Sequence, residues 1–247
     1  MKKALLCGLF ASVISFSVHS NDGFYSNTNL LNAIDNGDDG VVSSILSSKY
    51  YKDSVGDVIG TRTPLMAAIM RGNNMIFDII LSNASESDMN AIVNGQNALT
   101  CAISHGNVHA VEKLLEKGAD ANLQFNGGGS ALLDAINKRN VDIVRLLIEH
   151  GADPLMFEIS PSGKKISMLD YVASMNKRDE TSVMIKKYLQ DAADRQLAHS
   201  VEQGHVAICQ FLVENGAKPR AEFNRNLSIM DYAQQNRQSI YQLLGGR

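Results

Sequence analysis

Apolar and polar positions recur along this chain with a period of about 33 residues. Each copy of the pattern starts with a leucine or a similar residue, has a small residue three positions later, and reaches a glycine or a polar residue four positions after that. Glycine and asparagine tolerate a positive φ angle, so this last position predicts the end of a short helix. The starting positions are Leu30, Leu65, Leu99, Leu132, Leu169, Leu197 and Met230.

A second apolar stripe follows each of these turns. It occupies positions 12, 15 and 16 after the starting leucine, a spacing that puts the side chains on one face of a second helix. Two copies then end in Gly-Ala-Asp, at residues 118–120 and 151–153, where glycine stops the helix. One copy cannot bury its stripe alone, whereas stacked copies can. The clearest stripes are Val111, Leu114 and Leu115; Val144, Leu147 and Ile148; and Cys209, Leu212 and Val213.

The fifth copy departs from this period. Leu132 and Leu169 are 37 positions apart, whereas Leu169 and Leu197 are only 28 apart. The segment Pro154–Lys165 alternates apolar and polar residues before a Pro-Ser-Gly turn, which predicts a lengthened β-hairpin. The next junction, residues 190–196, is too short for a full hairpin. We therefore expect the stack to be irregular between the fifth and sixth copies.

The repeating pattern resembles the ankyrin-repeat family. Residues 63–68, Thr-Pro-Leu-Met-Ala-Ala, are similar to the Thr-Pro-Leu-His-x-Ala signature of that family. Residues 106–108 and 118–122 resemble its second-helix and loop consensus. The resemblance extends over about residues 27–244 and is clearest in the second, third, fourth and sixth copies. It implies an all-α solenoid of about seven stacked ankyrin repeats, each a helix–turn–helix followed by a β-hairpin finger.

The beginning of the chain has a different character. Lys2 and Lys3 precede an apolar run from Ala4 to Val18, and small side chains surround a possible cleavage point after Ser20. This is the pattern of a secretory signal peptide. A membrane anchor is the alternative, but the run is shorter than the roughly 20 residues that a spanning helix needs.

The sequence therefore predicts three segments. They are a signal peptide at residues 1–20, a short linker at 21–26 and an ankyrin-repeat domain at 27–247. Within that domain we expect repeats near residues 27–60, 61–94, 95–127, 128–160, 161–193, 194–225 and 226–247.

Net charge limits the kinds of partner that the chain can bind, and the cysteine spacing argues against a disulfide. The chain carries a net charge of −3, and loss of the two lysines of the signal peptide would make it −5. That balance argues against nucleic acid or an anionic membrane as the main partner. No second long apolar run follows, so we expect no stable membrane insertion after cleavage. Cys101 and Cys209 lie three repeats apart, too far for a disulfide, and we interpret both as buried core residues.

Catalytic and cofactor-binding motifs are scarce. The sequence has no Gly-x-Ser-x-Gly, no His-Glu-x-x-His, no phosphate-binding loop and no Cys-x-x-Cys. The best metal-like cluster is Cys101, His105 and His109. We interpret it as a buried thiol with two surface histidines, and a metal or haem site is the alternative. We accordingly expect no enzyme activity, no catalytic residues, no cofactor and no bound metal.

Binding residues are predicted where first helices end and at the fingers. The resemblance implies that partners bind there, on the concave face. A helix end beside a turn is normally polar, and an exposed methionine at this position suits adaptable protein contacts. Aromatic and arginine residues are enriched at interface hot spots, although the finger aromatics could instead pack along neighbouring fingers. The candidates are Met70, Arg71, His105, Phe125, Lys138 and Phe157.

Together these features predict an exported, monomeric, non-enzymatic scaffold that binds a protein partner. The short signal with its Lys-Lys start favours a Gram-negative periplasm, with secretion as the alternative. Inhibition and assistance of a periplasmic protein are both compatible with such a scaffold. The specific roles left open are an immunity protein against a toxic effector, an accessory factor for an exported stress-defence enzyme, and an effector that binds host proteins.

Overall fold

The computed structural model describes most of the predicted repeat domain. The described residues are 26–49, 51, 55–122, 130–155, 157–159, 165–175, 179–224 and 227–245; for 157–159, 165–166 and 222–224 this applies to the backbone alone. The predicted signal peptide lies outside these residues. The chain divides into two compact units, Met1–Ala110 and Val111–Arg247, here called unit 1 and unit 2.

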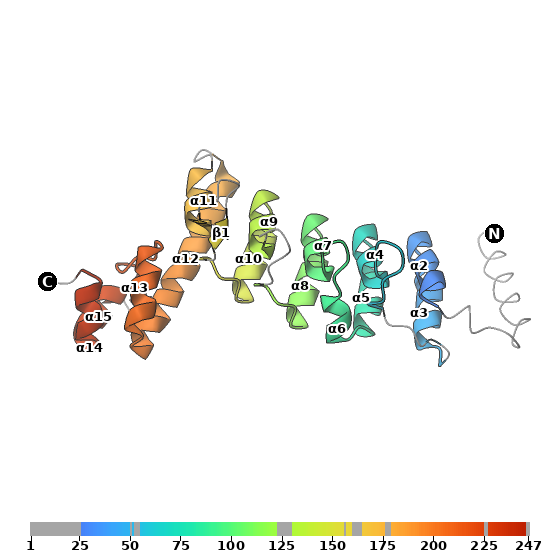
Figure 1. Cartoon of the computed structure of the whole chain (residues 1–247), viewed down its shortest axis with the longest axis horizontal. Helices are drawn as coiled ribbons and strands as arrows, with labels where there is room; N and C mark the ends of the chain where they lie inside the picture. The colour runs from blue at the N-terminus through green and yellow to red at the C-terminus, as the bar shows by residue number, and fades with distance from the viewer. Residues whose placement is uncertain are drawn as a thin grey trace, which may run out of the picture. The chain divides into compact units, whose positions relative to one another are not determined.

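Unit 1 is built from antiparallel pairs of short helices (Figure 1). The first helices α2, α4 and α7 pack in a row, and the second helices α3 and α5 pack against each other. A short helix, α6, precedes α7 and packs on it. The elements are α2 (Asn27–Asn36), α3 (Asp39–Ser47), α4 (Pro64–Arg71), α5 (Asn74–Ser82), α6 (Glu86–Asn90), α7 (Ala98–Ser104) and α8 (Val108–Glu116), within which the boundary between the units falls.

Unit 2 contains further helix pairs and two hairpins. The hairpin of β1 and β2 pairs Phe157 with Ser167 and Ile159 with Lys165, which confirms the hairpin predicted in the fifth repeat. A second, irregular hairpin joins β3 and β4. The elements are α9 (Ala131–Asn137), α10 (Val141–Glu149), β1 (Phe157–Ile159), β2 (Lys165–Ser167), α11 (Met168–Ser174), α12 (Glu180–Gln203), α13 (Val206–Glu214), β3 (Glu222–Asn224), β4 (Leu227–Ser228), α14 (Ile229–Asn236) and α15 (Gln238–Leu243).

Most predicted core positions are buried in both units, whereas Val213 and Met230 are only partly buried. The starting leucines and the small residues three positions later are almost fully inaccessible, because neighbouring helices approach each other there. Cys101 and Cys209 are free and buried, as predicted for small core residues. The buried set includes Leu30, Leu65, Leu99, Leu132, Leu169 and Leu197 with Ala33, Ala68, Ala102, Ala135 and Val172, and the second-helix positions Val111, Leu114, Val144, Leu147, Cys209 and Leu212.

Five of the described turns between paired helices have the predicted backbone geometry. Gly37, Gly72, Gly106 and Gly204 all have φ between 65° and 77°. Arg139 occupies the same position of the fourth repeat and has φ 55°, a conformation that costs an L-amino acid roughly 1–2 kcal/mol. The fourth repeat therefore keeps the turn geometry without glycine, whereas Arg237, at the same position of the seventh repeat, has φ −147°.

Helix α12 is the main departure from the repeat. It runs unbroken for 24 residues and packs on α10 and α11 as well as on α13 and α14 (Figure 1). It is therefore both the second helix of the fifth repeat and the first helix of the sixth. The expected repeat boundary between residues 193 and 194 falls inside α12. At residues 190–196, where we expected the stack to be irregular, the chain forms a continuous helix and no hairpin finger.

The sequence explains why α12 does not stop. The second helices of the third, fourth and sixth repeats are followed by Gly118, Gly151 and Gly216, each with a positive φ. The equivalent position of the fifth repeat is Tyr188, and no glycine or proline occurs between residues 180 and 203. The turns at the two ends of α12 are consequently about 36 Å apart, at 1.5 Å of helix per residue.

Proline substitutions test the continuity of α12. Arg195→Pro places proline at an exposed position in the middle of the helix, where it removes a hydrogen bond and clashes with the preceding turn. We expect it to lower the free energy of unfolding by about 3 kcal/mol. Glu180→Pro, at the first helical position after the N-cap Asp179, is the matched control and should be nearly neutral. Urea unfolding followed by circular dichroism measures both, and equal tolerance of the two prolines would contradict a single helix.

The strained turn at Arg139 gives a second prediction. Arg139→Ala and Arg139→Gly both remove the ion pair with Asp179, in which the nitrogen and oxygen are 2.9 Å apart. Only glycine relieves the positive φ, so we expect Arg139→Gly to be more stable than Arg139→Ala by about 1 kcal/mol. Because both variants lose the ion pair, its contribution drops out of the difference between their free energies of unfolding. Equal urea midpoints would show that the turn stores no strain.

Candidate protein-interaction site

Two successive turns of unit 1 enclose a shallow groove. Its volume is about 490 Å³. One wall is the turn between α4 and α5, and the other is the turn between α7 and α8. The lining residues are Ile69, Met70, Arg71, Gly72, Asn74, His105, Gly106, Asn107, Val108 and His109. Three of the six predicted binding residues, Met70, Arg71 and His105, are thus brought together.

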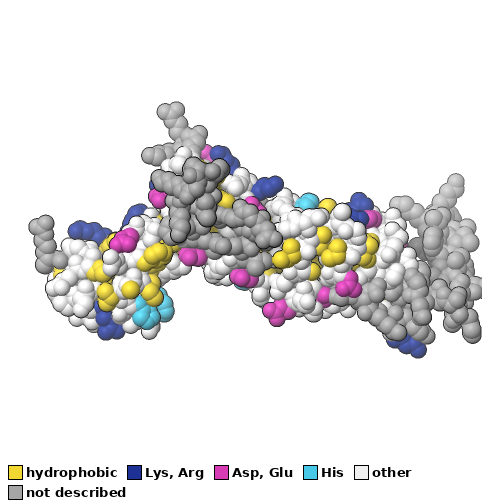
Figure 2. All heavy atoms as spheres, viewed as in Figure 1, with side chains coloured by type: hydrophobic (Ala, Val, Ile, Leu, Met, Phe, Trp, Pro, Cys, Tyr) yellow, Lys and Arg dark blue, Asp and Glu magenta, His cyan; other side chains and the backbone are white. Residues whose placement is uncertain are grey.

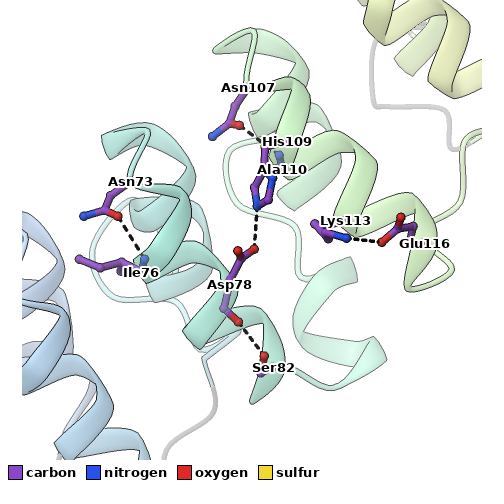
Figure 3. A network of polar contacts seen from close by, with 9 residues as sticks. All are labelled: Asn73, Ile76, Asp78, Ser82, Asn107, His109, Ala110, Lys113 and Glu116. Carbon is purple, nitrogen blue, oxygen red and sulfur yellow. Dashed lines mark hydrogen bonds and ion pairs between the residues drawn. The ribbon is translucent and has the colours of Figure 1, made fainter.

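Each wall of the groove is fixed by the same local structure. Gly72 and Gly106 reverse the chain after the first helix, with φ 66° and 65°. The side chains of Asn73 and Asn107 then accept hydrogen bonds from the backbone N–H groups of Ile76 and Ala110, at 3.2 and 3.0 Å (Figure 3). These caps satisfy N–H groups that the second helices leave unpaired at their beginnings. The groove therefore has a rigid frame on both sides.

Arg71 reaches back to the preceding repeat. Its Nε donates to Oδ1 of Asp35 at 3.1 Å, and Arg62 binds the other oxygen of the same carboxylate. Partial burial opposes ionisation of Asp35, but hydrogen bonds from Arg71 and Arg62 and their positive charges outweigh it and hold the pKa of Asp35 below its usual value. One carboxylate thus holds two guanidinium groups at the rim of the groove.

His105 is exposed at the end of α7, and its orientation is set by the backbone. Its Nδ1 lies 2.8 Å from the carbonyl oxygen of Cys101, so Nδ1 carries the proton in this hydrogen bond. The Cys101 Sγ is 3.8 Å away, and burial raises the pKa of this thiol to about 11. A thiol that stays protonated at neutral pH is a poor metal ligand. No metal-binding group of three side chains is present within the part of the chain that the structure describes.

His109 differs from the sequence interpretation, which made it a surface residue. Its side chain is half-buried, and its Nε2 donates to Oδ1 of Asp78 at 2.8 Å, which ties α8 to α5 (Figure 3). Its ring also meets the buried ring of Phe77 edge-on, with centroids 6.1 Å apart. His109 is therefore a structural contact beside the groove, and it cannot turn towards Cys101 without losing this hydrogen bond.

The other predicted residues do not contribute to the groove of unit 1. Lys138 is exposed at the end of α9, in unit 2. Phe157 lies in β1, but its side chain is outside the described residues, as is all of Phe125. Exposed apolar side chains occur elsewhere in both units, and Figure 2 shows several on one face of the molecule. The most exposed of these are Val58, Met75 and Ile92 in unit 1 and Val183, Met184, Val206, Ile208 and Phe211 in unit 2.

Sequence reasoning missed the contacts that support the site. Asn74 and Asn107 line the groove. Asn73 and Asn107, each directly after a glycine turn, were visible capping signals. The pairing of Asp35 with Arg71 joins the ends of two successive first helices. Opposite charges at equivalent ends of neighbouring repeats could have predicted it, whereas the contact from Asp78 to His109 joins positions that are not equivalent and had no such signal.

Comparison with known proteins identifies the repeat. The family model for ankyrin repeats in three copies matches residues 30–125 and 65–158, which together span more than half of the chain. The chain belongs to the ankyrin-repeat family. The predicted fold class, an all-α solenoid of about seven ankyrin repeats, is confirmed. Proteins of this family typically bind other proteins through the surface that their stacked repeats create.

Among solved structures, the ankyrin repeat domain of Bcl-3, described as a unique member of the IkappaB protein family, is similar at 20% identity. The similarity covers 88% of this chain and 81% of that one, with a TM-score of 0.48. No curated protein matches the chain. Among the described residues, no helix is long and apolar enough to cross a membrane.

The shared carboxylate at the rim predicts a pH-dependent stability. Asp35→Asn removes the acceptor of two guanidinium groups, so we expect it to lower the free energy of unfolding at pH 7 by about 1 kcal/mol. The folded state lowers the pKa of Asp35 below 3.8, the ordinary pKa of an aspartate. The carboxylate therefore stabilises the fold at pH values above 3.8, and this stabilisation is lost as the pH falls through the lowered pKa. The difference between wild type and variant should therefore shrink below about pH 4.

Urea unfolding at several pH values measures this difference. Glu112→Gln is the control, because it also removes one negative charge, from an exposed position of α8 that has no ion pair in the described structure. It should cost little at any pH. A difference for Asp35→Asn that persists unchanged to pH 3 would contradict the role given to the two arginines.

Proposed function

We propose that this protein is an exported, non-enzymatic scaffold that holds a partner protein at the groove of unit 1. The observation that carries this proposal is the convergence of Met70, Arg71 and His105 on one groove. The ankyrin family supports a protein as the partner. The side chains that line the groove are suited to contact, and the pKa of the nearby buried Cys101 thiol is raised to about 11, which disfavours a thiolate nucleophile beside His105.

The composition of the groove suits a protein interface. Met70 is 46% exposed at a position where a helix end is normally polar, and methionine adapts its shape to a partner. Arg71 and the amide side chains of Asn74 and Asn107 provide polar contacts around it. A central apolar or arginine anchor within a polar rim is the usual arrangement of interface hot spots.

The groove alone is too small to be the whole interface. A stable complex buries roughly 800 Å² on each partner, whereas this groove accommodates only a few side chains. The neighbouring ends of α2, α4 and α7, which pack in one row, would supply the remaining contact area. The partner segment would accordingly lie along this row, with its anchor in the groove.

Export is supported by the first twenty residues alone. A basic start, an apolar run and small residues around Ser20 are the features of a cleaved signal. We propose the periplasm as the destination, with secretion as the alternative. Inhibition of the partner and assistance of the partner both follow from binding, and the identity of the captured protein distinguishes them.

Affinity capture tests the proposal. The full chain, tagged at its C-terminus and expressed in a Gram-negative host, should be recovered from the periplasmic fraction with a mass that lacks residues 1–20. Mass spectrometry then identifies co-purified proteins, and direct titration with the purified candidate measures affinity. Recovery of uncleaved protein in the cytoplasm would remove export from the proposal without affecting the groove.

A matched pair of methionine variants locates the binding site. Met70→Gln places a polar amide in the groove, so we expect partner affinity to fall about tenfold, the loss typical of an interface hot spot. Met184→Gln makes the same change at a position of α12 that is 42% exposed and should leave affinity unchanged. If both variants bind the partner like wild type, with both folded, the groove is not the site.

A further inference from the structure

We infer that the groove of unit 1 selects an acidic segment of its partner, in which an aspartate or glutamate lies beside an aliphatic residue. This inference rests on the proposed function, because it gives the chemistry of the partner at the same groove. The relevant residues are those that line the groove and those that hold Arg71.

The lining of the groove is cationic. Its one arginine is Arg71, and none of the lining residues is an aspartate or a glutamate. The helix ends do not change this sign, because each turn brings the negative end of a first helix beside the positive end of a second helix, and the two largely cancel. The side chains therefore decide which charge the groove attracts.

The positive charge of Arg71 is not neutralised by Asp35. Both oxygens of this carboxylate are occupied, one by Arg71 and the other by Arg62, so one negative charge serves two positive charges. Arg71 uses its Nε in this contact, and no other contact of its guanidinium group is present among the described residues. The side chain is half-exposed, which leaves its terminal N–H groups accessible to a ligand.

Asp35 also prepares Arg71 for binding. Arginine has a planar fork of N–H donors that matches the two oxygens of a carboxylate. A free arginine side chain loses conformational entropy when it is fixed in a complex, and a side chain that is already held loses less. The contact between Nε and Asp35 therefore favours recognition of a carboxylate by the remaining N–H groups.

The exposed methionine determines the second feature of the partner. Met70 precedes Arg71 directly and lines the same groove, while Ile69 beneath it is buried. An aliphatic side chain next to the bound carboxylate would cover Met70 and exclude water from the ion pair. Asp38 and Asp39, at the turn of the first repeat, are not part of the lining and would repel a carboxylate placed there. This repulsion restricts the acidic residue to the Arg71 end.

The charge pattern favours a polypeptide over a nucleic acid. The chain as a whole carries a net charge of −3, so the cationic groove is a local feature. Binding to nucleic acid draws on several phosphate contacts at once, which need several cations, whereas the groove lining contains one arginine. One fork-shaped cation beside one apolar side chain matches a single acidic residue in a peptide segment.

Selection from a random library of short peptides displayed on phage tests this inference while the natural partner is still unidentified. Wild-type protein should enrich peptides in which aspartate or glutamate adjoins an aliphatic residue. Selection on Arg71→Glu should instead enrich lysine and arginine, because the charge of the groove is reversed. Lys186→Glu, an equal charge change at an exposed position of α12, is the control and should enrich the same acidic peptides as wild type.

Titration of an enriched peptide gives the magnitude. Affinity of the acidic peptide for Arg71→Glu should be at least about tenfold lower than for wild type, and should also fall at high salt for wild type. Peptides without acidic enrichment, or an acidic preference that survives Arg71→Glu, would overturn the inference. If such peptides still lose affinity with Met70→Gln, the groove remains the binding site and only the charge selection fails. No enrichment of any peptide also counts against the inference.

Discussion

The structure depends on the fact that no repeat can bury its own apolar stripe. Each pair of helices covers one side of its core residues and leaves the other side to the next pair. Small residues such as Ala68 and Ala102 allow the first helices to approach closely, and leucines such as Leu65 and Leu99 fill the space between them. The groove between two turns, where we propose that a partner binds, is a consequence of this side-by-side packing.

The same constraint explains what happens where the period fails. Without a glycine at Tyr188, nothing stops the second helix of the fifth repeat, and α12 continues until Gly204. Its buried residues, among them Leu189 and Leu197, keep the core continuous along the helix. The continuous helix interrupts the row of first-helix ends, because those of the fifth and sixth repeats lie at opposite ends of α12. The turns of unit 2 therefore do not form one uninterrupted row.

Sequence reasoning reached the fold because the fold follows from local periodicity. The starting leucines, the glycine turns and the hairpin at β1 and β2 each have a signal within a few residues. The candidate site was only partly accessible in this way. That Met70, Arg71 and His105 lie together could be predicted because they occupy equivalent ends of neighbouring helices. The carboxylate shared by Arg62 and Arg71 depends instead on side-chain directions across two repeats. No spacing in the sequence specifies those directions.

The fold and the proposed contacts with a partner therefore depend on different positions. The leucine and the small residue of each first helix face the core and vary little from repeat to repeat. The last two helix positions face solvent, so the fold accepts Met70 and Arg71 in one repeat and Ser104 and His105 in the next. Asp35 occupies such a position too, and its contact with Arg71 makes the charge of one repeat depend on its neighbour. In the proposed binding mode, specificity is a property of two adjacent repeats together, which a single ankyrin unit could not provide.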